Sequence, residues 1–332
     1  MYVYHLPHAR LLLIGIALLL AVNLHAQRLL KQQKLSRWDL PAANYSGLAT
    51  WGENRYAMID DKSTAIGFLP LQIIQNERTG KIRHIQAGPF RGNTPAKGMS
   101  VHPDLEDIAF VPEWQTFFIA SEATQQIWEC DTMGQFTGRQ LHIPEYFSTV
   151  KQNGGFESIT YDSSAHRFWT TTENPLPEDS SFHRILCFGD DLAPQFHLRY
   201  LCSPPQLKKG KFYAHGISSL LALPDGRLLV MERELSVPAR YIGAKTLIHV
   251  FVVQPNVHSE SSYIEKKEMF HFTTHLKAGS TNFGNYEGMA LGCRLTNGKQ
   301  TLLLISDSQA GAGNKMLHLK DYIKVIILPD GF

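Results

Sequence analysis

Cysteine, net charge and long apolar runs are all scarce in this sequence, and each shortage excludes a class of protein. The cysteines are Cys130, Cys187, Cys202 and Cys293, and none belongs to a C-x-x-C pair. A chain of 332 residues does not need disulfides for stability, so we expect free, buried thiols, with a Cys187–Cys202 bridge as the alternative and no cysteine zinc site. The formal net charge of +2 argues against a nucleic-acid partner and against an acidic tail.

The N-terminal apolar run is too short to span a membrane. It covers residues 11–22, follows His8 and Arg10, and precedes Ala26. A membrane span needs ~20 apolar residues, whereas a basic start, a short apolar run and a small residue are typical of a secretory signal peptide. We predict a signal peptide over residues 1–26, although Leu24 departs from the A-x-A pattern and leaves an uncleaved anchor open. Residues 27–332 would then form one exported domain, secreted or periplasmic, with no other membrane contact.

Two sequence motifs of hydrolases are also absent. No G-x-S-x-G nucleophile elbow occurs, which argues against an α/β-hydrolase esterase. The 15 histidines include no H-E-x-x-H pattern, so a zinc-protease site is not indicated.

The sequence does contain a loose internal repeat. Each copy is an apolar run with a polar residue near its start, followed by a second run with a polar residue near its end. The copies are 45–61, 104–122, 155–173, 214–233 and 286–307. Repeats of short strands at this spacing indicate a propeller or a solenoid.

The polar residues of each copy are equidistant from a turn. Glu157 and Glu173 centre on the turn D-S-S-A-H, and Glu287 and Asp307 centre on Asn297, directly before Gly298. Residues equidistant from a hairpin turn face each other at ~5 Å. We therefore predict that each hairpin places two polar side chains together, at the end opposite its turn.

Two further strand-like runs follow most copies, which gives four antiparallel strands per repeat. The sequence predicts an all-β protein, a β-propeller of four-stranded antiparallel blades. Five blades account for the repeats, and a sixth in the longest interval or near residues 72–100 is left open. The last repeat lacks a fourth strand, whereas an unassigned run at 33–40 precedes the first. We predict that this N-terminal strand closes the C-terminal blade and removes its open edge.

The first strand of each propeller blade lines the central channel, so the polar pairs should ring one mouth of it. The predicted ring consists of Ser46, Asp60, Glu106, Glu122, Glu157, Glu173, His215, Glu232, Glu287 and Asp307. Carboxylates that face each other repel, so shared protons, basic partners or bound cations must offset them. Oxygen ligands favour Ca²⁺, with Mg²⁺ second, over Zn²⁺. Acids at strand ends that fasten neighbouring blades are the structural alternative.

The order of these motifs resembles a known family. S-G-L-A, D-L-E-D-I-A, N-G-G-F-E-S-I, A-L-P-D-G-R-L-L-V-M-E-R, N-Y-E-G-M-A and L-L-L-I-S-D are similar to the phytase-like propeller domain, labelled "esterase-like activity of phytase", from about residue 43 to 328. The resemblance implies an exported propeller with calcium-dependent phosphoester hydrolase activity. The D-x-P-A-[IV]-W signature of alkaline propeller phytases is absent, so the resemblance does not extend to phytate hydrolysis.

Matched by motif, the family's acidic positions correspond to Glu106, Glu122, Glu157, Glu173, Glu232, Glu287 and Asp307. These seven and Asp60 are the predicted metal ligands. The family's basic residue corresponds to Arg233, with Lys62 in the first blade, and His215 stands where an acid is expected in the fourth.

The predicted reaction is attack by a metal-activated water on a phosphoester. Glu157 or Glu287 would be the general base, and the sequence does not choose between them. Arg233, Lys62 and Arg55 would clamp phosphate, or each would form a salt bridge with a neighbouring acid.

Two functions follow from the same predicted ring. One is an exported, calcium-dependent phosphoester hydrolase that acts on a small-molecule substrate. The other is a non-catalytic, calcium-stabilised propeller that binds a ligand or partner at the same mouth. In both cases we expect a monomer.

Overall fold

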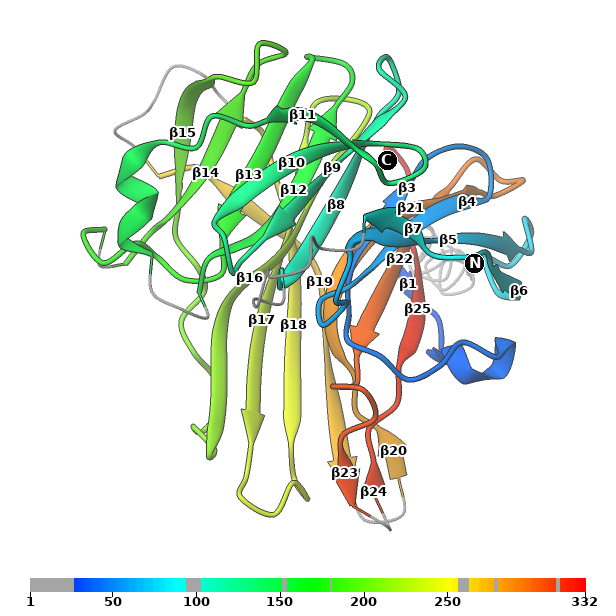
Figure 1. The fold of residues 1–332 in the computed structure, drawn as a ribbon. Helices are drawn as coiled ribbons and strands as arrows, with labels where there is room; N and C mark the ends of the chain where they lie inside the picture. The colour runs from blue at the N-terminus through cyan, green and yellow to red at the C-terminus, as the bar shows by residue number, and fades with distance from the viewer. Residues whose placement is uncertain are drawn as a thin grey trace, which may run out of the picture.

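The computed structural model describes residues 27–93, 103–150, 154–179, 181–255, 263–277, 280–314 and 317–332. The predicted signal peptide, residues 1–26, lies outside them. Within the described ranges the chain is all-β: five four-stranded antiparallel blades follow one another in chain order, from blue to red in Figure 1, without an α-helix. No helix in this part of the chain has the length and apolar content needed to cross a bilayer. The predicted five-bladed propeller is confirmed.

In each blade the first strand lines the central channel and the fourth strand lies at the outer edge. Blade 1 contains β3 (Tyr45–Thr50), β4 (Arg55–Asp60), β5 (Ile66–Gln75) and β6 (Ile82–Ala87). Blade 2 contains β8 (Leu105–Val111), β9 (Thr116–Ser121), β10 (Gln126–Asp131) and β11 (Phe136–Gln140). Blade 3 contains β12 (Phe156–Asp162), β13 (Arg167–Thr172), β14 (His183–Phe188) and β15 (Pro194–Tyr200). Blade 4 contains β16 (Phe212–Ala222), β17 (Leu228–Val237), β18 (Lys245–Val253) and β19 (Lys266–Lys277).

Blade 5 joins the two ends of the chain. Its strands are β21 (Asn285–Arg294), β22 (Gln300–Asp307), β25 (Tyr322–Ile327) and, on the outer edge, β1 (Arg28–Leu29) with β2 (Gln33–Lys34). The predicted N-terminal closure is therefore confirmed. Of the predicted run 33–40, however, only Gln33 and Lys34 are extended, because Leu35–Trp38 form a 3-10 helix.

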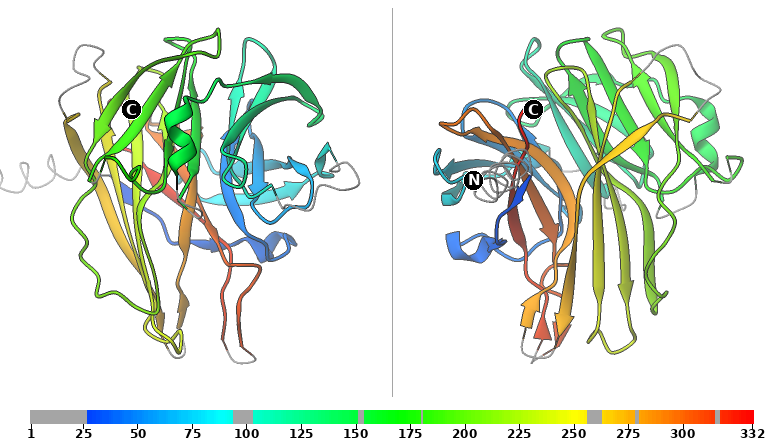
Figure 2. Two further views of the ribbon diagram at one scale, coloured as in Figure 1. Left: turned by 60° about the vertical axis from the view of Figure 1, so that its left-hand side comes forward. Right: turned by 180° about the vertical axis from the view of Figure 1, so that it is seen from behind.

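The remaining short strands form no sixth blade in the part of the chain that the structure describes. β7 (Arg91–Asn93) pairs with β5, β20 (Ser280–Asn282) extends blade 4, and β23 (Gly313–Asn314) pairs with β24 (Leu317–His318). The long interval between the last two repeats is occupied by the extended strands of blade 4. Figures 1 and 2 show β16 to β19 running beyond the other blades, toward the end where β20 and the β23–β24 hairpin also lie.

Neighbouring inner strands are hydrogen-bonded through side chains. Asp107 on β8 accepts hydrogen bonds from the Ser158 hydroxyl at 2.9 Å and the Ile159 amide at 3.1 Å, both on β12. The Ser158 hydroxyl in turn accepts one from the Leu220 amide of β16 at 2.7 Å. Close approach also requires glycine, because a Cβ on Gly47 would lie 2.6 Å from the Cα of Asp107. These contacts hold successive blades around the axis.

The four cysteines are free thiols. Cys130 and Cys187 are buried, as predicted, and Cys202 and Cys293 are half-buried. The alternative Cys187–Cys202 bridge is wrong: the Cys202 sulfur instead lies 3.5 Å from Nδ1 of His183.

Removing residues 27–34 is expected to destabilise the propeller by at least about 2 kcal/mol, the cost typical of deleting one buried leucine. Leu30, 8% exposed, packs in the core beneath the closing strands, and its amide bonds to Val325. The truncation also exposes the β25 edge, which can pair with another chain. Thermal unfolding followed by light scattering measures both effects. An unchanged melting temperature without aggregation would contradict the closing role of these residues.

Candidate active site at the acidic mouth

A β-bulge recurs at the same point of the inner strand in all five blades. The register of each inner hairpin shifts directly after a buried apolar residue, after Tyr45, Leu105, Phe156, Ile217 and Tyr286. The residue that enters each bulge is Ser46, Glu106, Glu157, Ser218 or Glu287. A bulge re-aims a side chain locally, so the repeat presents one polar residue per blade at the same end of the channel.

The second strand of each blade ends beside this bulge. In each blade one residue of the second strand pairs with the inner-strand residue that comes directly before the buried apolar residue. These second-strand residues are Asp61, Glu122, Glu173, Arg233 and Asp307. Together with Glu106, Glu157 and Glu287 from the bulges, the acidic members of this row form what we call the acidic mouth.

The structure brings six of the predicted ring acids together at the mouth and places three of the predicted ring positions elsewhere. Asp60 pairs with Tyr45 and accepts hydrogen bonds from the amides of Asn44 and Lys62, so Asp61 is the mouth residue of blade 1. His215 lies opposite Glu234 and does not enter a bulge. The structural equivalent in blade 4 is Ser218.

Glu232 is the third exception, because it fastens blades and does not face the mouth. Its carboxylate accepts hydrogen bonds from the Tyr200 hydroxyl at 2.7 Å, from Lys266 Nζ at 2.5 Å and from the Ser203 amide at 3.0 Å. Burial alone would raise its pKa, but the bonds from Lys266 and Tyr200 outweigh burial and lower it. The mouth residue of blade 4 is its neighbour, Arg233.

Arg233 is the central cation of the acidic mouth. Its side chain is 7% exposed. Nη2 lies 2.5 Å from Glu173 and 3.6 Å from Glu157, and Nη1 bonds Glu287. The guanidinium is thus held by carboxylates from blades 3 and 5, and its pKa rises further above its ordinary value because these charges outweigh burial. This is the salt-bridge alternative considered for Arg233.

The second cation, Lys62, lies at the opposite side of the mouth. Its Nζ is 3.2 Å from Asp61 and also bonds Asp104. The Lys62 side chain is 51% exposed, so it is far more accessible than Arg233. Arg55 lies at the start of β4, in the turn region at the other end of the hairpin, where its guanidinium stacks on Trp51. It is not part of the mouth.

The acidic mouth contains more carboxylates than basic side chains, because Arg233 and Lys62 are the two cations that compensate them. Burial, followed by the charges of Glu157, Asp61 and Glu287, raises the pKa of Glu106 well above its usual range. Burial and the Glu173 charge do the same for Glu157. Burial raises the pKa of Glu287 to about 8 although Arg233 opposes the shift, and it raises that of Asp61 to about 7. A site of this kind gains stability from an additional cation or from protons.

Oxygens of Asp61, Asp104 and Glu106 lie close enough together to hold a hard cation. One carboxylate oxygen from each of Asp61, Asp104 and Glu106 lies within 4.8 Å of the other two. Among the described residues, Oδ1 of Asp61 and Oδ1 of Asn285 are buried acceptors without a hydrogen-bond partner. Calcium is bound by six to eight oxygens from carboxylates, carbonyls and amides. Oxygen donors of this kind suit Ca²⁺ or Mg²⁺. Of the predicted metal ligands this group contains Glu106, whereas Asp61 and Asp104 were not predicted.

A cleft of about 380 Å³ opens onto the acidic mouth between blades 4 and 5. Its polar residues are Arg233, Asn285, Glu287, Asp307 and Gln309. Its apolar residues include Phe212, Leu235, Val237, Tyr241, Leu276, Phe283 and Leu319, most of them on the extended strands of blade 4. The cleft is thus apolar along its walls and acidic at its base. Glu287 borders it and Glu157 does not, which separates the two candidate bases.

The opposite part of the channel is mainly apolar, although Asp107 and Asp162 also line it. A cavity of about 470 Å³ is lined there by the inner strands beyond their bulges, including Leu48, Ile108, Ile159, Leu220 and Met289. Fewer carboxylates line this cavity than form the acidic mouth.

The acids that recur in this order on successive blades match a known family. A model described as phytase-like, "Esterase-like activity of phytase", matches residues 41–309. The chain belongs to this phytase-like family. No curated protein matches the chain at a significant level.

Some solved structures resemble the chain at low identity. An endo-arabinase from Bacteroides thetaiotaomicron is 11% identical, with a TM-score of 0.46, and covers 91% of this chain and 98% of its own. A periplasmic gluconolactonase from Pseudomonas aeruginosa is 9% identical, with a TM-score of 0.43 and coverage of 86% and 88%. Likenesses at this level say nothing about the activity of the phytase-like chain.

Proposed function

We propose that this phytase-like protein is an exported, calcium-dependent phosphoester hydrolase whose reaction takes place at the base of the cleft. The observation that carries the proposal is the cleft itself: it ends on buried carboxylates with raised pKa values, beside acceptor oxygens that lack partners. Perturbed acids at the base of a concave pocket are typical of catalytic sites. A basic and apolar N-terminal segment supports export.

The ligands proposed for the cation are Asp61, Asp104 and Glu106, with Asn285 nearby in the mouth. A bound Ca²⁺ would neutralise phosphate oxygens and increase the acidity of an attacking water. Lys62 is the accessible basic residue beside these ligands and is suited to attract the anionic substrate.

Glu287 is the proposed proton carrier, because it borders the cleft and its pKa is raised to about 8. A group with a pKa near the working pH can accept a proton and release it. In hydrolysis, water forms a bond to phosphorus, the bond from phosphorus to the alcohol oxygen breaks, and a proton passes to the leaving alcohol. Arg233 and Asn285 position the carboxylate, since Nη1 of Arg233 bonds Oε1 of Glu287 and Nδ2 of Asn285 donates to it at 2.7 Å.

The shape of the cleft favours a phosphoester with an apolar alcohol. Side chains such as Phe283, Leu276 and Leu235 line its walls, and they would exclude water from an aromatic or aliphatic group. A densely phosphorylated substrate such as phytate would instead bring many negative charges against an apolar wall and an acidic base. We therefore propose monoesters of apolar alcohols as the substrate class.

The test is an assay of the mature chain against aryl and alkyl phosphomonoesters, phytate and carboxyl esters, with Ca²⁺, Mg²⁺ or a chelator. We expect turnover of the apolar phosphomonoesters that the chelator abolishes. Glu287→Gln should lower kcat by about 10²–10⁴-fold, the usual contribution of a general acid–base group. Glu53→Gln, at an exposed turn distant from the mouth, is the matched control and should retain full activity.

Two results would overturn the proposal. Turnover that survives both the chelator and Glu287→Gln would place the reaction elsewhere. Inactivity across the whole panel, with calcium still raising the melting temperature, would support the non-catalytic, calcium-stabilised propeller instead.

A further inference from the structure

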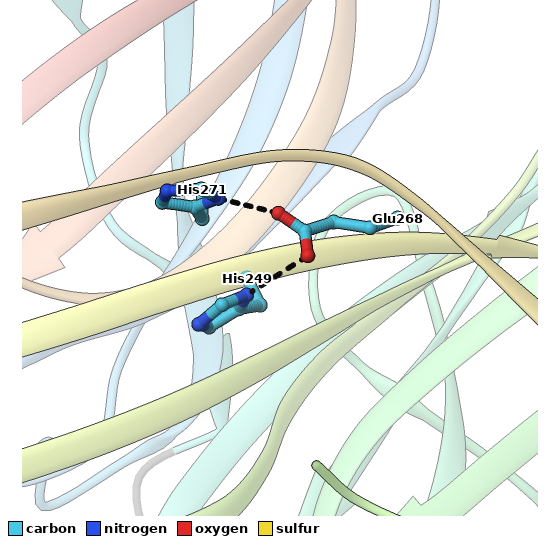
Figure 3. Close-up of side chains that lie close together, drawn as sticks. All are labelled: His249, Glu268 and His271. Carbon is cyan, nitrogen blue, oxygen red and sulfur yellow. Dashed lines mark hydrogen bonds and ion pairs between the residues drawn. The ribbon is translucent and has the colours of Figure 1, made fainter. Parts of the chain in front are cut away.

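A second group of potential metal ligands lies on the two outer strands of blade 4, which contribute no residue to the acidic mouth. It consists of His249 on β18 and of Glu268 and His271 on β19 (Figure 3). His249 and His271 are direct partners across the antiparallel pair, and their ring centroids are 5.1 Å apart. Side chains directly opposite each other lie on the same face of a sheet, so the pairing register itself brings the two imidazoles together.

A β-bulge brings the carboxylate to the same face. Residues 268 and 271 are three apart, and in a regular strand they would point to opposite faces. The register shifts between Val250, which pairs with Phe270, and Phe251, which pairs with Glu268, so Met269 has no partner. This extra residue shifts the alternation of side chains between the two faces of the sheet, so that residues 268 and 271 point to the same face. Glu268 therefore shares a face with both histidines.

The three side chains converge on one point, as Figure 3 shows. Their ligand atoms all lie within 4.8 Å of one another. Nδ1 of His271 contacts one oxygen of Glu268, and Nδ1 of His249 lies 3.6 Å from the other, too far for a hydrogen bond. Among the described residues, Nδ1 of His249 is a buried polar atom without a hydrogen-bond partner.

The surroundings leave this nitrogen available to a ligand. The other ring nitrogen of His249, Nε2, lies 3.4 Å from the side-chain amide of Gln206, and the ring stacks on Phe251. A metal-binding imidazole commonly has its second nitrogen held by a polar neighbour, which fixes the ring orientation. Exposure of the side chains increases from 12% for His249 to 40% for Glu268 and 61% for His271, so the site is open to solvent on one side.

We propose that His249, Glu268 and His271 bind a divalent transition-metal ion, in first place Zn²⁺. Two imidazoles and one carboxylate are a ligand set found in zinc sites that keep a fourth position for water. The nitrogen donors distinguish this site from the acidic mouth, whose oxygen ligands suit Ca²⁺ or Mg²⁺. The bound ion would clamp β18 to β19 at the bulge. The site stands independently of the proposed hydrolase activity.

The experiment uses mature, metal-stripped protein from which any purification tag has been removed. Co²⁺ is the probe, because its visible absorption reports both binding and tetrahedral geometry. We expect one bound Co²⁺ per chain, displaced by Zn²⁺ and unaffected by excess Ca²⁺. His271→Ala and Glu268→Gln change exposed side chains and should each weaken Co²⁺ binding more than about tenfold, by removal of a ligand.

His275→Ala is the matched control, since His275 lies on the same strand outside the cluster. It should bind Co²⁺ as the unchanged protein does. Equal Co²⁺ affinity in His271→Ala, or displacement of Co²⁺ by Ca²⁺, would overturn the proposal, as would the absence of stoichiometric binding. Circular dichroism of each variant confirms that a loss of binding is not a loss of fold.

Discussion

Replacing Arg233 with glutamine is expected to lower the free energy of unfolding by about 3–5 kcal/mol, the cost of removing one partner from a buried ion pair. The guanidinium is 7% exposed and contacts Glu157, Glu173 and Glu287. Without it, these acids would remain buried with no opposite charge among them. Denaturant unfolding at pH 8 measures the loss, because Glu287, whose pKa burial raises to about 8, is far more ionised there than at pH 5.

Two comparisons show whether the loss of stability in Arg233→Gln is electrostatic. At pH 5 the effect of Arg233→Gln should shrink, because burial raises the pKa of Glu157 and of Glu287, and their protonated carboxyl groups no longer need the cation. Arg227→Gln is the matched control: Arg227 pairs with Asp225, which is 48% exposed, and exposed pairs contribute ~1 kcal/mol or less. If Arg233→Gln costs no more than Arg227→Gln at pH 8, Arg233 does not hold the mouth together.

Metal-free protein is expected to lose stability as the pH rises from about 4.5 to 8, and calcium should restore it. Folding raises the pKa of Asp61 to about 7 and that of Glu287 to about 8, in each case mainly through burial. Between the unfolded and folded pKa values the native state holds protons that the unfolded chain has released, so the free energy of unfolding falls with pH across this window. Each unit of pKa increase corresponds to ~1.4 kcal/mol once the group is fully ionised.

A cation bound to the mouth would replace those protons. At a calcium concentration 100 times the dissociation constant, binding to the native state alone adds ~2.7 kcal/mol of stability. Melting temperatures measured from pH 5 to 8, with Ca²⁺ and with chelator, should therefore diverge as the pH rises. Two curves that coincide at pH 8 would show that the mouth does not bind calcium.

The sequence was sufficient to predict the propeller because its signal is repeated. Five hairpins, each with a polar residue near both ends, cannot bury their apolar faces alone, and stacked blades provide that burial. Closure by an N-terminal strand also followed from the sequence, since the last repeat lacked an outer strand. What failed was the length of that strand: Leu35 to Trp38 turn into a 3-10 helix after only two paired residues.

The errors in the predicted ring have one physical cause. The prediction paired residues at equal distances from a turn, which is valid only where the hydrogen-bonded pairing of the two strands is uninterrupted. Every inner strand, however, contains a bulge that shifts the register. The prediction therefore selected Asp60 in place of Asp61, and Glu232 as a ring acid beside Arg233. A signal was available: each bulge residue follows a large apolar residue, such as Leu105 before Glu106. Alignment on that apolar position would have identified Ser218 in place of His215.

Other parts of the site had no sequence signal of this kind. Asp104 and Asn285 reach the mouth only because of the hairpin register. The cleft depends on the unusual length of β16 to β19, which was hidden in the longest interval between repeats. The group of His249, Glu268 and His271 also requires the bulge at Met269, and alternation alone would place Glu268 on the wrong face.

The most direct test of the central claim is a crystal structure of the mature protein grown with Ca²⁺ and examined for anomalous scattering. We expect an ion at the acidic mouth, coordinated by oxygens of Asp61, Asp104 and Glu106, with Lys62 displaced toward solvent. An acidic mouth without an ion at saturating calcium, in which Lys62 still binds Asp61 and Asp104, would contradict the account.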